Sequence, residues 1–120
     1  MGEKTLLGII GLTTCIGIYM GWQFLRGVRN PPMLVAIHLL LGLGSLEVLA
    51  VILRGAPNGG QLVDRNGILL AAGLLAGALL TGFSVPLIAK PVPDAVGISI
   101  ATHAGIGTVA FLALCYAVLG

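Results

Sequence analysis

The sequence contains very few charged residues. Only 8% of its 120 residues are Asp, Glu, Lys or Arg, 58% are hydrophobic, and the mean hydropathy is +1.10. A water-soluble domain carries about 25% charged residues, so a soluble globular protein is excluded. The six Lys and Arg residues are scattered and give a net charge of only +2, which does not indicate a nucleic-acid-binding protein.

Cysteine and catalytic motifs are scarce as well. Cys15 and Cys115 both lie in apolar runs, at different expected depths, so we expect two free thiols rather than a disulfide. The chain has no Ser-His-Asp set, no paired carboxylates and no glycine-rich phosphate loop, and no segment outside the apolar runs is long enough to form a catalytic domain. We therefore do not expect an independent enzyme.

Long apolar runs, by contrast, are abundant. A helix needs about 20 apolar residues to cross the hydrocarbon core, and four segments reach that length: residues 5–25, 33–53, 68–89 and 98–119. The stretches between them collect Gly, Pro, Asn and charge, which are typical of turns. The first run is too long for the apolar part of a signal peptide. Because unpaired backbone groups cannot face lipid, the sequence predicts an all-α, four-helix transmembrane bundle forming a single domain over residues 1–120.

The chain also shows a weak internal repeat. It contains 19 glycines, and small residues let membrane helices approach closely. A shift of 65 residues aligns Gly17 with Gly82 and His38 with His103. The same shift also aligns Gly8 with Gly73, Gly42 with Gly107, Leu49 with Leu114 and Gly55 with Gly120. We interpret the chain as two duplicated helical hairpins, related by a pseudo-two-fold axis along the membrane normal.

The only two histidines occupy equivalent positions in this repeat. His38 and His103 each lie five residues into the second and fourth apolar runs, which corresponds to a depth of about 7–8 Å. These two runs cross the membrane in the same direction, so the imidazoles can face each other across a flat ligand. This arrangement predicts axial ligation of the iron of one haem b by His38 and His103. Hydrogen bonding between helices and ligation of a chlorophyll magnesium are the alternatives.

Neighbouring residues fit a haem at this position. Gly42 and Gly107 follow the histidines by one helical turn, where a missing side chain would leave room for the edge of a porphyrin. Arg26, Arg29 and Lys90 lie on the side of the membrane nearest the histidines, where we expect them to meet the haem propionates.

Glu47 is the one charged residue well inside an apolar run. It follows His38 by nine residues, which places it on the opposite face of the same helix. Three interpretations remain open for Glu47: a hydrogen bond to a hydroxyl group such as that of Thr13 or Thr14, a contact with another subunit, and a proton relay for quinone chemistry.

In helix number and in the pair His38 and His103, the chain resembles four-helix membrane b-type cytochromes. Two-haem members of that group would need four histidines, so this chain would bind a single haem. The resemblance implies an electron-transfer subunit of an energy-transducing membrane, bacterial or organellar, with other membrane subunits, a redox protein or a quinol as partners. A cofactor-free accessory subunit and, less favoured, a small transporter are the other interpretations.

Overall fold

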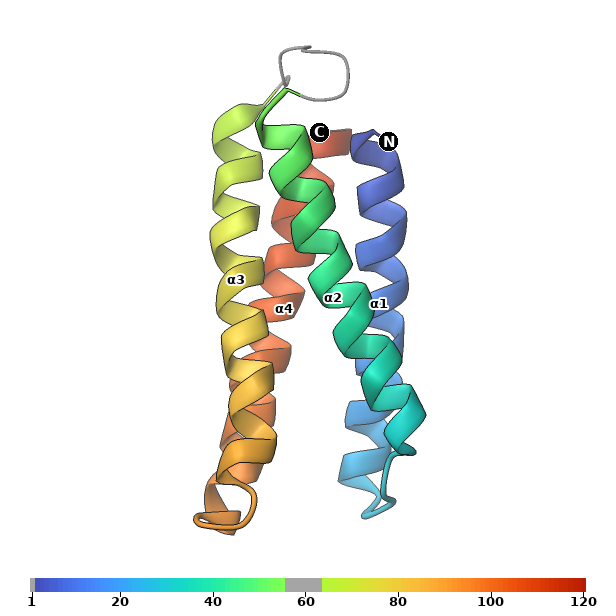
Figure 1. Ribbon diagram of the computed structural model, residues 1–120, viewed down its shortest axis with the longest axis vertical. Helices are drawn as coiled ribbons and strands as arrows, with labels where there is room; N and C mark the ends of the chain where they lie inside the picture. The colour runs from blue at the N-terminus through green and yellow to red at the C-terminus, as the bar shows by residue number, and fades with distance from the viewer. Residues whose placement is uncertain (1, 56–63) are drawn as a thin grey trace.

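The computed structural model describes residues 2–55 and 64–120 and consists of four long helices that run alternately up and down (Figure 1). Helix α1 spans Glu3–Leu25, α2 Pro32–Leu53, α3 Arg65–Ile88 and α4 Val96–Leu119; a 3-10 turn, η1, covers Pro93–Ala95 immediately before α4. The bundle measures 46 × 22 × 22 Å. Each of the four is long and apolar enough to cross a membrane, and each begins and ends within three residues of the predicted span. The prediction of an all-α, four-helix transmembrane bundle is confirmed.

The helix ends follow local rules. Gly27 and Gly55 lie just beyond the ends of α1 and α2 and adopt φ values of +72° and +83°, a left-handed conformation that glycine adopts without steric cost. Pro32 occupies the first position of α2, where its missing N–H costs no hydrogen bond. The Asp64 side chain caps α3 by accepting a hydrogen bond from the Gly67 N–H at 2.9 Å. These residues mark the ends of α1 and α2 and the starts of α2 and α3.

Helices that follow one another in the chain lie side by side, and α1 also packs against α4, with α3 and α4 forming the most extensive contact. Helices α2 and α4, which carry the two histidines, therefore face each other across the diagonal of the bundle. Both chain termini lie at the same end (Figure 1). Cys15 and Cys115 are free thiols, as expected.

The interior is tightly packed only near the termini, in what we call the tight half. Two residues from each helix form its core: Leu6, Ile10, Leu49, Ile52, Ile68, Ala71, Leu114 and Ala117. Ser45, Ala78 and Ala110 continue the buried interior toward the middle of the bundle. No residue is buried between positions 11 and 44 or between 79 and 109, and we call this part the loose half. There the two hairpins diverge (Figure 1).

Burial repeats with the same 65-residue shift that aligns the histidines. Leu6 and Ala71 are both fully buried, and so are Leu49 and Leu114. The shift also pairs the buried Ser45 with the buried Ala110, and Ile52 with Ala117. Eight of the eleven buried residues among those described thus fall in equivalent pairs, whereas Ile10, Ile68 and Ala78 have counterparts that are only partly buried.

Candidate functional site

The structure brings His38 and His103 together at the centre of the loose half. His38 comes from α2 and His103 from α4, six and seven residues after their helices begin, so both lie about 9–10 Å along the helix. Their ring centroids are 5.9 Å apart, and the ring planes are inclined by 84°. Both side chains are partly buried. Two imidazoles at one depth therefore meet across the diagonal of the bundle.

Each imidazole is anchored by its Nδ1 atom to the backbone of the other helix in its own hairpin. His38 Nδ1 lies 3.1 Å from the carbonyl oxygen of Thr13 in α1, and His103 Nδ1 lies 2.7 Å from that of Ala78 in α3. A carbonyl oxygen only accepts hydrogen bonds, so Nδ1 carries the proton in both rings. In a neutral imidazole this leaves Nε2 with a free lone pair.

This is the arrangement found in metal-binding histidines. A ligating histidine usually donates its other ring N–H to a carboxylate or a backbone carbonyl, which fixes the tautomer and the ring orientation. Both histidines have that second partner, and positions 13 and 78 are related by the 65-residue shift. The two half-sites are thus built in the same way.

A glycine lies against each imidazole. A Cβ atom at Gly17 would lie 3.0 Å from Cε1 of His38, and one at Gly82 would lie 2.9 Å from Cε1 of His103. Any larger residue would push the ring away from its carbonyl partner. The sequence pattern marks Gly17 and Gly82 only as members of the repeat, and sequence reasoning missed their contact with the imidazoles. Their shared offset of 21 residues from the histidines is the signal that could have revealed it.

The spacing of the rings suits one metal between them. Two metal–imidazole bonds of about 2 Å on opposite sides, with about 1 Å from each nitrogen to its ring centre, place the ring centres roughly 6 Å apart. The observed separation is 5.9 Å. Among the described residues, no group of three or more His, Cys, Asp or Glu side chains could hold a metal ion. In the described part of the chain the two imidazoles are therefore the available side-chain ligands at this place, without a third of these four types beside them.

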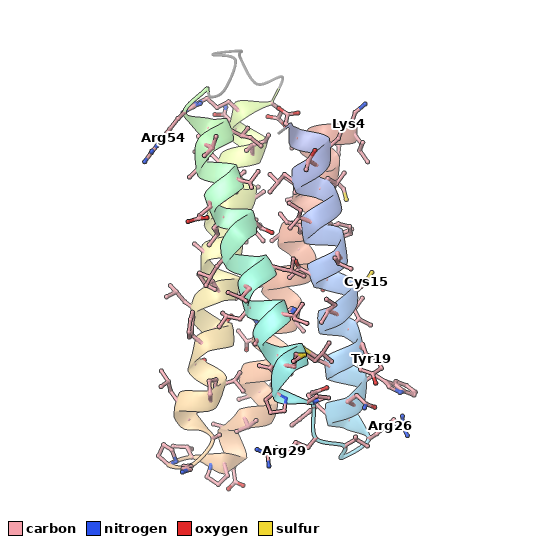
Figure 2. All side chains as sticks on the ribbon, turned by 45° about the vertical axis from the view of Figure 1, so that its right-hand side comes forward. Lys4, Cys15, Tyr19, Arg26, Arg29 and Arg54 are labelled. Carbon is pink, nitrogen blue, oxygen red and sulfur yellow. The ribbon has the colours of Figure 1, made fainter. Side chains whose placement is uncertain are left out.

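The surroundings provide space and positive charge. A Cβ atom at Gly42 would meet nothing within 4 Å, and one at Gly107 would come no closer than 4.0 Å to the Cβ atom of Ala78. Arg26 and Arg29 both lie in the connection between α1 and α2, at the end of the loose half. In Figure 2 Arg29 extends below the bundle toward the α3–α4 hairpin, whereas Arg26 extends away from it. Arg26 also bonds Gln23 at 3.3 Å, so the two arginines are not equivalent.

Lys90 lies just beyond the end of α3, at the same end of the bundle as the two arginines, and is exposed. The cations expected near the histidines are therefore on one side of the bundle, and they come from both hairpins.

Glu47 lies on the outer surface of α2. Its side chain is exposed, whereas His38 on the same helix is partly buried, as the nine-residue separation predicted. The hydrogen bond considered between Glu47 and Thr13 is not formed, because the Thr13 hydroxyl donates to the carbonyl of Ile9 at 2.8 Å. Across the described part of the chain no hydrogen bond links Glu47 to Thr14 either. The carboxyl group faces the surroundings of the bundle and not its interior.

Comparison of the chain with protein-family models, with curated proteins and with solved structures gives no match.

Proposed function

We propose that the chain is a membrane electron-transfer protein, or the electron-transfer subunit of a larger complex, that holds one haem b between His38 and His103. The observation that carries this proposal is the pair of imidazoles 5.9 Å apart, each with Nδ1 bonded to a carbonyl and Nε2 free. When bound, the haem supplies one-electron chemistry at its iron.

The chain contributes orientation, space and charge. The carbonyls of Thr13 and Ala78 hold each ring in the tautomer that leaves the Nε2 lone pair free. Gly17 and Gly82 let the rings lie close to the neighbouring helices. The tight half holds the two hairpins together beside the site, so the loose half can admit a flat group without loss of the core. Arg29 and Lys90 supply the positive charge that haem propionates require.

The proposal extends to the setting of the protein. A single haem near one surface of an apolar bundle suits exchange of electrons with a quinol in the bilayer, or with a redox protein at that surface. We therefore infer an energy-transducing membrane, bacterial or organellar, as its location. Electron exchange with either partner would not require this chain to have a domain outside the membrane.

A visible spectrum of the protein purified in detergent, oxidised and then reduced with dithionite, tests the proposal. We expect a Soret band and a sharp reduced α-band of a low-spin haem, with one haem per chain by pyridine haemochrome assay. His38→Ala or His103→Ala should each abolish or convert the low-spin spectrum, and the double variant should bind no haem.

The matched control is Thr108→Ala, which removes an exposed polar group from α4 and should leave the spectrum unchanged. Low-spin bands that persist unaltered in either single histidine variant contradict the proposal.

A cofactor-free accessory subunit is the second candidate function, and one observation favours it. Glu47 exposes a carboxyl group on the surface of an apolar helix, where lipid contact is costly. A neighbouring membrane subunit with a hydrogen-bond donor at that depth would relieve the cost. Purified protein that binds no haem but co-purifies with a defined membrane complex would favour this candidate.

A further inference from the structure

The two half-sites differ in the hydroxyl groups near their anchoring carbonyls: the Thr13 hydroxyl of the first hairpin donates to Ile9 O, whereas the second hairpin has Thr81. In the second hairpin, Thr81 of α3 lies one turn from the carbonyl that anchors His103. Its Oγ1 atom is 3.0 Å from Ala78 O, 2.9 Å from Gly77 O and 3.5 Å from Nδ1 of His103. The equivalent position in the first hairpin, 65 residues earlier, is Ile16, which has no polar group. The carbonyl of Thr13 therefore has no such neighbour.

The Thr81 hydroxyl changes the number of hydrogen-bond donors around the carbonyl oxygen that accepts from the histidine. A carbonyl has two lone pairs. Within a continuous α-helix, Gly82 donates its N–H to Ala78 O, and Gly17 donates to Thr13 O. With the histidine N–H added, Thr13 O meets two donors. Ala78 O meets three, because the Thr81 hydroxyl is within hydrogen-bond distance as well.

The Thr81 hydroxyl carries only one proton, and it has two carbonyls within reach. Each time it donates to Ala78 O, it competes with the His103 N–H for the same lone pairs. The His103 bond is nevertheless the shorter of the two, 2.7 Å against 3.1 Å at His38, so the effect of the hydroxyl is measured against the same His103 bond without Thr81 and not against the His38 bond. The strength of the His103 bond sets how much electron density the imidazole can give at Nε2, because a strongly bonded Nδ1–H makes the ring a more basic ligand.

We propose that Thr81 is a positioning residue that weakens electron donation by His103 and so raises the reduction potential of the bound haem. The inference rests on the proposed function, since it concerns the haem held by these histidines. A less basic imidazole ligand stabilises ferric iron less. The reduced haem is then favoured relative to the oxidised haem, and the reduction potential rises. The first hairpin has no hydroxyl equivalent to that of Thr81, because Ile16 stands at that position. Only the His103 half of the repeated site therefore has this effect on its ligand.

The test uses three variants of the full chain in detergent and a potentiometric titration of each. Thr81→Val removes the hydroxyl at nearly constant volume and should lower the midpoint potential. Thr81→Ser keeps the hydroxyl and should restore a potential close to that of the wild type. Ile16→Thr introduces the hydroxyl into the first half-site and should raise the potential.

A second readout needs no haem. In protein labelled with 15N-histidine, Thr81→Val should move the Nδ1–H proton resonance of His103 downfield, as its hydrogen bond strengthens, and leave that of His38 in place. Ile16→Thr should move the His38 resonance upfield.

The outcomes separate this inference from the proposed function. A wild-type chain that binds no haem refutes the function. A chain that binds one low-spin haem with the same potential in the wild type and in Thr81→Val refutes the tuning role and leaves the function intact. A potential that rises in Thr81→Val also overturns the inference, because the hydroxyl would then be acting as an acceptor from Nδ1. If Thr81→Val fails to fold, the midpoint potential and the His38 Nδ1–H resonance of Ile16→Thr provide the test.

Discussion

The tight half and the loose half of the bundle differ in packing, although the same four helices form both. The tight half buries two residues from every helix, and the loose half buries none. The histidines lie in the loose half, where the hairpins diverge (Figure 1). The difference is a division between one end that joins the two hairpins and another end, with the histidines, that is less tightly packed. Each of the following variants tests one side of that division.

The largest effect should come from Gly82→Ala. A Cβ atom at Gly82 would lie 2.9 Å from Cε1 and 3.0 Å from Nδ1 of His103, so the ring must rotate and release the carbonyl of Ala78. We expect loss of the low-spin spectrum while the helical circular dichroism stays unchanged. Gly73→Ala is the matched control, because a Cβ atom there meets nothing within 4 Å. Equal haem content in both variants would contradict the assigned contact.

In the tight half, Leu114→Ala should destabilise the bundle. Leu114 is fully buried in the core, and its truncation leaves a cavity. Because lipid is as apolar as leucine, the transfer contribution is small in a membrane, and we expect a loss of about 2 kcal/mol, the low end of the range for soluble cores. Unfolding in mixed detergent micelles measures it. Leu112→Ala, on the exposed face of the same helix, should change stability far less.

Arg29→Gln should have a moderate effect on the haem and none on the fold. Removing a partly screened cation from a propionate costs about 0.2–1 kcal/mol, so haem affinity should fall by up to about fivefold, and the reduction potential should fall because the cation favours the reduced state. Haem transfer to apomyoglobin measures the change in haem affinity. Arg26→Gln should have a smaller effect, since Arg26 extends away from the α3–α4 hairpin (Figure 2). The reverse ranking would place the propionates elsewhere.

Glu47→Gln should have the smallest effect. Its side chain lies on the outer surface of α2, away from the imidazoles, and the amide keeps hydrogen-bonding capacity. Haem content and the rate of reduction should be nearly unchanged. Loss of quinol-dependent reduction with intact haem would instead assign Glu47 to proton transfer.

Much of the fold could be predicted from the sequence, because lipid forces each apolar run of sufficient length into a helix. The joint position of His38 and His103 followed from the repeat and from the shared direction of their helices. The anchoring carbonyls could not be predicted, since every residue has one and neither Thr13 nor Ala78 is marked by its side chain. The unequal packing of the two halves was equally hidden, because Leu49 and Leu40 look alike in the sequence although only Leu49 is buried.

If His38 and His103 hold a haem as proposed, the 84° angle between the imidazole planes has a magnetic consequence. Each planar ligand donates π density mainly into the iron d orbital that lies perpendicular to its own plane. Two nearly perpendicular rings therefore raise two different orbitals by similar amounts and leave them close in energy, whereas parallel rings would separate them. With the rings in this orientation, the oxidised haem should give the single, strongly low-field electron paramagnetic resonance feature of an axial low-spin centre, in place of three well-resolved rhombic lines.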